Sequence, residues 1–397
     1  MTVIEFFDKN AIENVISSLL CNPDKVVFIG YNRNAMKKAI NKYNSIAIEH
    51  GKTIDFSSYS IARNNLQEII NIITRVLEEN GEITIDLTGG EDLYLVASGM
   101  VYSNNPEKVQ LHRFNVDNGK LYDCDADGNV ISISADTITI EENIEIYGGR
   151  VVYDNEIPIG THKWDFTNDF RKDIETMWKI CCKNPGNWNS TMTCFDMSGT
   201  QNDVENNDVL VDKTKKFFDT IPSIFRDLSK YGLVKDVKIK NGVLNFQCKN
   251  EQIKRCLTKA GQLLELKTTN MLLTLNEEAN GELFDDVLTG VTIYWEESNE
   301  NQSNVVNEID VVVMKGLVPI FISCKNGFVD VNELYKLNTV AEHFGGEYAR
   351  KVLIATEELN AITINRAEEM DIRDIDGIGN RNLQDKELKR KLKSIFN

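Results

Sequence analysis

The chain has 397 residues, more than a single hydrophobic core usually holds, so its length predicts two or three domains. Its 44 basic and 61 acidic residues give a net charge of −17, which argues against a general nucleic-acid coat. No apolar run approaches about 18 residues, and Glu5 and Asp8 stand where a secretory signal would carry basic residues. We therefore expect a soluble cytoplasmic protein that makes no membrane contact.

The first 150 residues alternate short apolar runs with segments of helical period, the pattern expected of a parallel sheet flanked by helices. Strands are predicted at residues 25–30, 45–48, 53–56, 82–87 and 109–114. Helices are predicted at residues 34–42, 61–79 and 91–102. Two or three short strands between residues 120 and 147 are expected to add an antiparallel edge. The pattern therefore predicts an open α/β domain over residues 1–150.

Residues 151–250 are expected to connect two larger domains. Helical signals between residues 165 and 231 are interrupted at 184–207 by an Asn/Gly/Ser/Thr-rich stretch, which we expect to be a loop. Residues 233–248 predict a hairpin that turns at Asn241-Gly242, because Asn-Gly supplies the positive φ angles of a tight turn. A helix, a hairpin and another helix would suit a winged-helix-like connector.

The stretch from Arg226 to Lys259 is basic although the whole chain is acidic. It carries nine Lys or Arg residues against three acids. If the chain binds a polyanion for chemistry, we expect the polyanion's backbone to lie here.

The remaining residues, 251–397, again combine helices and strands. One long amphipathic helix is predicted from Glu251 to Met271. The segments after it are predicted as strands at 291–295, 308–314 and 319–325, a helix at 329–344, a strand at 351–355 and a charged helix at 385–393.

Two of these strands are expected to form a hairpin that carries a polar patch. A turn centred between Gly316 and Leu317 places Asp310 opposite Ser323 and Glu308 opposite Lys325, on one face. Apolar neighbours surround these four residues, so ionised carboxylates there need a counter-charge from a divalent cation or from Lys325. The alternative is purely structural: a Glu308–Lys325 ion pair, with Asp310 accepting a hydrogen bond from Ser323.

The strings NEIDVVV and VPIFISCKNG resemble the paired-strand core of the PD-(D/E)xK restriction-endonuclease-like fold. Within that fold they are similar to the C-terminal domain of CRISPR-associated nucleases that carry an N-terminal CARF domain. The resemblance implies a nuclease domain over residues 251–397. In it Asp310 and Glu265, a glutamate on the helix before the hairpin, would bind Mn²⁺ or Mg²⁺, and Lys325 would position or activate the attacking water.

Ser323 departs from the family pattern, because many members carry Asp or Glu at this position. Glu308 could supply the missing carboxylate as a third metal ligand. A nuclease that has lost its activity is the other outcome that the substitution allows. For Glu265, a lone surface glutamate is the structural alternative.

The first half places polar residues after two predicted strands, where open α/β sheets bind ligands. Gly30-Tyr31-Asn32-Arg33 follows one strand, and the run DLTGGED, residues 86–92, follows the other. Glycines let backbone N–H groups approach a phosphate, and a helix start adds partial positive charge. The chain has neither G-x-G-x-x-G nor a Walker motif, so the pattern specifies neither NAD nor ATP. A Gly-Gly turn by itself means only a tight bend.

Together with the C-terminal match, the DLTGG run resembles a Rossmann-like CARF domain, the sensor of cyclic oligoadenylates in type III CRISPR immunity. The resemblance implies a homodimer that binds one cyclic oligoadenylate, with cyclic tetra-adenylate as the expected activator. The residues expected at this site are Tyr31, Asn32, Arg33, Thr88, Gly89, Gly90, Glu91 and Asp92.

The function implied for the whole chain is a cyclic oligoadenylate-activated, metal-dependent endonuclease that cleaves DNA or RNA in antiviral defence. One alternative is a nucleotide-sensing, DNA-binding regulator whose nuclease domain is inactive, favoured by Ser323 and the basic hairpin. Another is a ring nuclease, in which the sensor itself hydrolyses the cyclic ligand.

Overall fold

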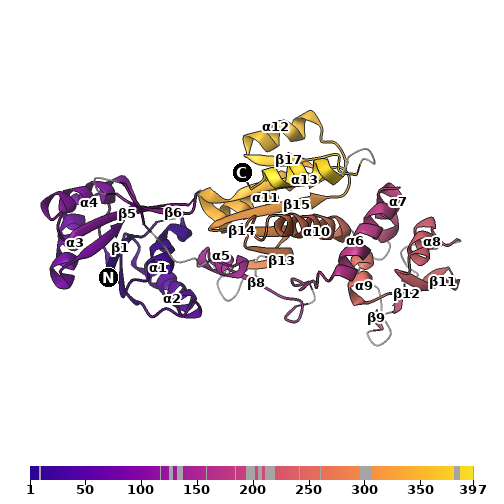
Figure 1. Cartoon of the computed structure of the whole chain (residues 1–397), viewed down its shortest axis with the longest axis horizontal. Coiled ribbons are helices and arrows are strands. Elements are labelled where there is room, and N and C mark those ends of the chain that lie inside the picture. The colour runs from indigo at the N-terminus through magenta and orange to yellow at the C-terminus, as the bar shows by residue number, and fades with distance from the viewer. Residues whose placement is uncertain are drawn as a thin grey trace.

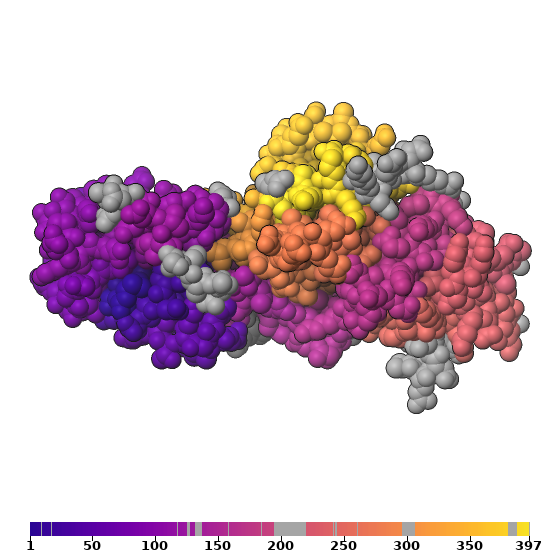
Figure 2. Space-filling view, in the orientation of Figure 1, coloured from indigo at the N-terminus to yellow at the C-terminus, as the bar shows by residue number. Residues whose placement is uncertain are grey.

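The computed structural model is mixed α/β, as expected. It describes residues 1–396 except 9, 117, 125–127, 132–136, 158, 184, 194–201, 204–207, 211–219, 241, 260, 296–305 and 380–384. The described strands form three sheets of seven, four and six strands. The sheet built mostly from the last third of the chain lies between the other two, so the order in space differs from the order in the chain (Figures 1 and 2).

The first sheet has the order β3-β2-β1-β4-β5-β6-β7. Its parallel strands are β1 (Thr2–Phe6), β2 (Lys25–Gly30), β3 (Asp55–Ser60), β4 (Ile83–Asp86) and β5 (Val109–Asn115). The predicted antiparallel edge is present as β6 (Lys120–Asp123) and β7 (Val130–Ile131). Helices cover both faces, namely η1 (Ala11–Asn14), α1 (Ile16–Leu20), α2 (Arg33–Glu49), α3 (Leu66–Asn80) and α4 (Asp92–Asn104).

Two features of this sheet differ from the prediction. The strand expected at 45–48 is wrong, because these residues form the last turn of α2, whose buried residues Met36, Tyr43, Ile46 and Ala47 follow a helical period. The central strand β1 was missed, because the buried carboxylate of Glu5 interrupts its short apolar run.

The connector region contributes α6 (Asn168–Cys181), α7 (Pro185–Met192) and α8 (Ser223–Lys230). Its sheet has the order β11 (Val234–Lys240), β12 (Val243–Cys248), β10 (Asp208–Leu210) and β9 (Asn202–Asp203). The predicted hairpin is confirmed, with Lys240 opposite Val243, although Asn241 of its turn lies outside the described residues.

The loop expected at 184–207 is wrong where α7 stands. Pro185 begins that helix, a position that suits proline, and Trp188 and Met192 are buried. The rest of that stretch lies largely outside the described residues. The winged-helix-like arrangement of the connector stays a prediction.

The third sheet has the order β17-β16-β15-β14-β13-β8. Its strands are β8 (Gly149–Val151), β13 (Asp286–Trp295), β14 (Val306–Lys315), β15 (Val318–Lys325), β16 (Arg350–Ala355) and β17 (Ile372–Ile375). The helices around it are α5 (Ile140–Ile146), α9 (Glu251–Thr258), α10 (Gln262–Glu278), α11 (Val331–Gly345), η2 (Gly346–Tyr348), α12 (Ala361–Glu369) and α13 (Asp385–Ser394). Because β8 pairs with β13, residues 149–151 belong to this sheet; the division at residue 150 stays a proposal.

The long helix predicted from Glu251 is two helices. Gly261 has a φ of +88°, a left-handed conformation that interrupts the helix between α9 and α10. Lys259 lies at this break, and α10 begins at Gln262. The break therefore places a lysine and the first turn of α10 beside the third sheet.

Within the described residues, no helix has the length and apolar character needed to cross a lipid bilayer.

Candidate nuclease site and candidate ligand turn

The hairpin of β14 and β15 has the predicted register. Five pairs, from Val311 opposite Ile322 to Lys315 opposite Val318, follow it. Its flanking side chains are buried on both faces, with Val312 and Phe321 fully inaccessible. Asp310 and Ser323 lie next to the Val311–Ile322 pair, at the end of the hairpin away from its turn. Their side chains are hydrogen-bonded at 3.2 Å. The polar patch therefore stands at one end of an otherwise apolar hairpin.

Asp310 is held by three donors from β15. Its Oδ2 accepts a hydrogen bond from the Cys324 N–H at 2.6 Å and from the Ser323 hydroxyl at 3.2 Å. The Lys325 ammonium lies 3.4 Å from the same oxygen. Three convergent donors fix the orientation of this carboxylate, which is what a metal ligand or an anchor for a catalytic lysine requires.

Lys325 lies between two carboxylates. Its Nζ is 3.1 Å from Glu333 of α11, in addition to its contact with Asp310. Burial disfavours its charge, but Asp310 and Glu333 outweigh burial and raise the pKa of Lys325. The side chain is therefore an ammonium ion at neutral pH. Glu333 was missed in the sequence, because α11 reaches Lys325 only through tertiary packing.

Glu265 occupies the first turn of α10 and is 4% exposed. The Gln262 amide donates a hydrogen bond to its Oε2 at 2.8 Å. Burial raises the pKa of Glu265 to about 8; Lys259 opposes that shift, and the carboxylates of Asp310 and Glu308 add to it. The structure thus brings Glu265 into electrostatic contact with the hairpin acids, and the lone surface glutamate alternative is wrong.

Glu308 is engaged by a different lysine from the one expected. It lies opposite Thr292 of β13 and forms an ion pair with Lys259, while Lys325 binds Asp310 and Glu333. The Glu308–Lys325 ion pair of the structural alternative is therefore wrong, whereas its other part, the hydrogen bond from Ser323 to Asp310, is confirmed. Burial opposes the charge of Lys259, but Glu265 and Glu308 outweigh it and raise its pKa.

The donor set suits a hard cation, although the acids do not form a tight cluster. Among the residues that the structure describes, no three histidine, cysteine or acidic side chains lie close enough to enclose a metal ion. Glu265 is nevertheless a buried carboxyl group whose ionisation Asp310 and Glu308 oppose, so a divalent cation between them would be stabilising. Carboxylate oxygens are the ligands that Mg²⁺ and Mn²⁺ prefer.

A cavity of about 230 Å³ lies beside this group. Glu308, Gln262 and Gly290 line it on the side of the acids. Gly290 has a φ of +63°, and a Cβ atom there would stand 3.7 Å from the Glu265 carboxylate. The other residues that line the cavity include Trp164, Arg255 and Lys259. One aromatic and two basic side chains thus line the same cavity as Glu308.

The first sheet has its topological switch point between β1 and β4, and the predicted glycine turn follows β4. Gly90 has a φ of +103°, and its N–H donates to the Asp8 carboxylate at 3.1 Å. The Thr88 N–H donates to Asp86 at 2.8 Å. Two N–H groups of the turn are thus bound by carboxylates, so the turn is shaped by acids as well as by its glycines.

The structure brings some of the other predicted ligand residues together. The Tyr31 hydroxyl donates to Glu91 at 3.3 Å, which joins the ends of β2 and β4. Asn32 caps α2 by accepting a hydrogen bond from the Ala35 N–H at 3.1 Å, so its carboxamide has a structural role. Arg33 begins α2, and the Arg63 guanidinium lies 5.5 Å from the centre of the Tyr31 ring. Arg63 was missed, because nothing in the sequence links it to the turn.

Asp92 is the first residue of α4 and is exposed. The remaining predicted positions belong to the glycine turn described above. The Gly89 and Gly90 positions have little space: a Cβ atom at Gly90 would stand 2.8 Å from the Cβ of Phe6.

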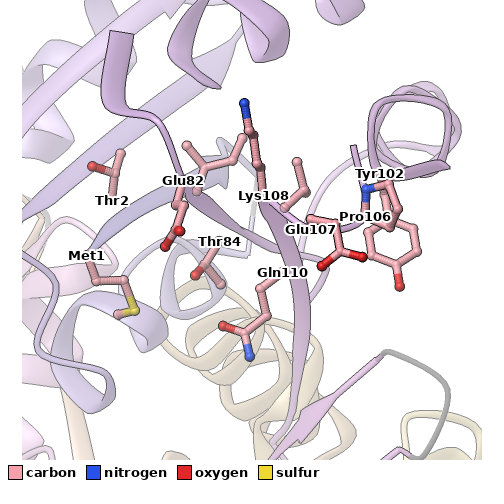
Figure 3. Close-up of a pocket in the computed structure, with 11 residues that line it drawn as sticks. Met1, Thr2, Glu82, Thr84, Tyr102, Pro106, Glu107, Lys108 and Gln110 are labelled. Atoms are coloured by element: carbon pink, nitrogen blue, oxygen red, sulfur yellow. The ribbon is translucent and has the colours of Figure 1, made fainter. Parts of the chain in front are cut away.

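A separate cavity of about 330 Å³ lies at the opposite edge of this sheet. Its lining residues include Thr2 of β1, Thr84 of β4 and Gln110 of β5, each the first or second residue of its strand (Figure 3). Ligands of open α/β sheets bind at the carboxyl ends of the strands. This cavity therefore does not coincide with the candidate ligand turn.

Residues 250–394 match the family model of the Card1-like endonuclease domain. No curated protein matches the chain in sequence. Among solved structures, the chain is similar to protein VC1899 from Vibrio cholerae, with 18% identity, a TM-score of 0.74 and coverage of 100% of this chain and 97% of that one. It is also similar to Can2 from Sulfobacillus thermosulfidooxidans, solved with cyclic tetra-adenylate. There the identity is 15%, the TM-score 0.72, and the coverage 100% of this chain and 99% of that one. These likenesses confirm the mixed α/β fold over the whole chain.

Proposed function

Since residues 250–394 match the Card1-like endonuclease domain, we propose that this chain is a cyclic oligoadenylate-activated, metal-dependent endonuclease of type III CRISPR defence. The observation that carries the proposal is the group formed by Asp310, Ser323 and Lys325, with the buried Glu265 in electrostatic contact with it. These are the residues expected from the PD-(D/E)xK resemblance, and the domain that holds them matches an endonuclease family.

In the proposed site, Asp310 and Glu265 hold Mn²⁺ or Mg²⁺, and Glu308 is the candidate for a third carboxylate. When bound, such an ion lowers the pKa of its water and neutralises charge on the scissile phosphate. The Cys324 N–H and the Ser323 hydroxyl keep Asp310 in place. Lys325, as an ammonium ion, places positive charge where a phosphate and its attacking water would meet.

The substrate is DNA or RNA, because hydrolysis of this kind needs no 2′-hydroxyl. The cavity beside the acids offers Lys259 and Arg255 for phosphates and Trp164 for a base. Further along, β11 exposes Lys235, Lys238 and Lys240. We infer that the polyanion's backbone runs over this basic region, as the local charge predicts.

The first sheet is proposed to bind the activator at its glycine turn. Can2, which shares the fold over the whole chain, is solved with cyclic tetra-adenylate. Arg33 and Arg63 would supply positive charge. Tyr31 and Glu91 would contact an adenosine. The backbone of Thr88, Gly89 and Gly90 would lie close to the ligand. A cyclic ligand shared by two copies of the turn implies a homodimer.

The test is one incubation of the purified chain with labelled single- and double-stranded DNA and RNA. It includes Mn²⁺ or Mg²⁺, with and without cyclic tetra-adenylate. We expect cleavage that needs both the metal and the activator, that EDTA stops, and that Asp310→Ala abolishes. Nucleic acid that is bound but never cut would favour the inactive DNA-binding regulator. Loss of the cyclic ligand itself would favour a ring nuclease.

A further inference from the structure

Glu13 joins the glycine turn to the nuclease half of the chain. It belongs to η1, which follows β1, and it is 7% exposed. Its Oε2 lies beside Gly89, only 3.0 Å from where a Cβ atom of that residue would stand. Its Oε1 accepts a hydrogen bond from the Tyr348 hydroxyl at 2.5 Å. A single buried carboxylate thus contacts the candidate ligand turn and a residue 335 positions later.

The turn and Glu13 are held together by one hydrogen-bonded unit. The Asp8 carboxylate accepts from the Gly90 N–H at 3.1 Å and from the Asn10 N–H at 3.0 Å. The Asn14 side chain accepts from the Asp8 N–H at 2.6 Å and donates to the Asp8 carbonyl at 2.9 Å. A displacement of the turn would therefore be transmitted to η1, which carries Glu13.

In the other half of the chain, Tyr348 lies just before β16, the strand that pairs with β15 and its Lys325. It ends η2, and β16 begins two residues later at Arg350. β16 pairs in parallel with β15 from Ile320 opposite Arg350 to Lys325 opposite Ala355. The last of these pairs contains the candidate catalytic lysine.

The tip of the catalytic hairpin also lies in the core of the first sheet. Leu317 and Val318 are buried in one hydrophobic cluster with Ile12 and Val15. Ile12 belongs to η1, the segment that carries Glu13. The two halves of the chain thus share packed side chains as well as a hydrogen bond, so a shift of η1 bears directly on the hairpin.

The charge around Glu13 makes its bond sensitive to an anion. Burial raises its pKa to about 7; the Tyr348 hydrogen bond opposes that shift, and the Asp8 and Glu347 carboxylates add to it. A phosphate at the glycine turn would bring further negative charge to this carboxylate. Whether Glu13 then takes up a proton or moves away, its hydrogen bond to Tyr348 weakens.

We propose that the Glu13–Tyr348 hydrogen bond stabilises the resting arrangement of the catalytic hairpin, and that an anionic ligand at the Gly89-Gly90 turn releases the hairpin by weakening this bond. The inference rests on the proposed function and names its regulation. A ligand shifts such an equilibrium only by its different affinity for the two arrangements, and repulsion from Glu13 in the resting one supplies that difference.

The test compares Tyr348→Phe with the wild-type chain. Without the bond, the ligand no longer has to weaken it, so cyclic tetra-adenylate should bind about tenfold more tightly by isothermal titration, since a hydrogen bond to a charged group contributes at least that much. Basal metal-dependent cleavage without the ligand should rise by a similar factor. Glu13→Gln should shift both quantities in the same direction. Tyr335→Phe, an exposed tyrosine on α11, is the matched control and should change neither.

The outcomes separate the inference from the proposed function. Wild-type values of affinity and basal cleavage in Tyr348→Phe, with an unchanged melting temperature, would overturn the inference alone. A wild-type chain that binds the ligand but never cuts would overturn the proposed function, while the titrations would still decide the inference. A chain that does not bind cyclic tetra-adenylate would overturn both.

Discussion

At the residue scale, Lys325 is the side chain on which cleavage should depend most. It lies 3.4 Å from Asp310 and 3.1 Å from Glu333, and these carboxylates keep it protonated. Lys325→Met removes the charge while keeping much of the volume. We expect the rate of metal-dependent cleavage to fall by at least about a hundredfold, the usual cost of losing one charge-stabilising group. Cleavage rates on an end-labelled strand at saturating metal measure the loss.

Lys336 provides the matched control, because its ammonium also pairs with Glu333, at 2.6 Å, but lies on the exposed face of α11. Lys336→Met should leave the cleavage rate within about twofold of wild type, since an exposed ion pair contributes little. Equal losses in the two variants would assign the effect to Glu333 and to the local field instead of to Lys325.

Glu265 should make stability and metal binding depend on pH. Its pKa in the folded chain, about 8, is above the ordinary value of 4.5, so the folded state binds more protons than the unfolded state between these pH values. The free energy of unfolding should therefore fall as the pH rises through this window, and Glu265→Gln should remove that contribution. Metal affinity should rise over the same range, because the ligand must be ionised.

Thermal unfolding of wild type and Glu265→Gln at pH 6 and pH 8, without metal, measures this effect. The glutamine variant should gain stability relative to wild type at pH 8. An equal difference in stability between wild type and Glu265→Gln at pH 6 and at pH 8 would show that Glu265 is not the buried acid that the structure describes.

Ser323 and Glu308 test where a third carboxylate comes from. Ser323 donates to Asp310, whereas Glu308 lines the cavity and forms an ion pair with Lys259. If Glu308 completes the metal site, Glu308→Gln should reduce cleavage far more than Ser323→Ala, which removes one of three donors to Asp310. The reverse order of rates would assign the positioning of the metal or water to the hydroxyl.

At the scale of the element, the break between α9 and α10 places both Lys259 and Glu265. Gly261 adopts a φ of +88°, which other residues adopt only at a cost of about 1 kcal/mol. Gly261→Ala should lower the free energy of unfolding by about that amount and also reduce cleavage, because the chain would tend to continue as a helix and move Lys259.

Gly281, just beyond the other end of α10, has a φ of +84° and, like Gly261, has open space where a Cβ atom would stand. Gly281→Ala should lose a similar amount of stability in chemical unfolding but keep the wild-type cleavage rate. If both alanine variants cut normally, the geometry of the break would not matter for the site.

The hairpin shows which elements could be predicted from the sequence. The turn at Gly316, whose φ is +59°, determines its register, and the structure confirms it. A turn is a local signal, whereas the side chains on both faces of the hairpin are apolar and buried, so they do not distinguish one register from the next. The strand predicted at residues 45–48 is wrong, because a short apolar run fits a strand as well as it fits the buried stripe of α2.

The residues themselves predicted the site where one hairpin carries them, and the family resemblance added Glu265 of α10. Asp310, Ser323 and Lys325 lie on the hairpin, so its register brings them together. Lys259 and Glu333 come from the α9–α10 break and from α11, and only tertiary packing brings them to the acids. Glu13 depends on β1, whose interruption by Glu5 hid both the strand and the segment after it.

At the scale of the whole molecule, the sheet that carries the candidate nuclease site lies between the first sheet, where we propose that the activator binds, and the connector (Figure 1). The hairpin reaches the first sheet's core through Leu317 and Val318, and α6 of the connector packs against α10. Both ends of the nuclease half are thus held by other parts of the chain. An arrangement of this kind can couple ligand binding to catalysis without a flexible linker.

We expect ligand binding at the first sheet and nucleic-acid binding at the third to be coupled. Coupling of binding free energies is reciprocal. Bound nucleic acid must therefore raise the affinity for the activator by the same factor as the bound activator raises the affinity for nucleic acid. The direct measurement is isothermal titration of cyclic tetra-adenylate into the Lys325→Met variant, which should hold a substrate uncut, with and without saturating nucleic acid. We predict that the activator binds at least about fivefold more tightly when nucleic acid is present, the lower end of usual coupling. Identical affinities in the two titrations would show that the two domains on this chain act independently.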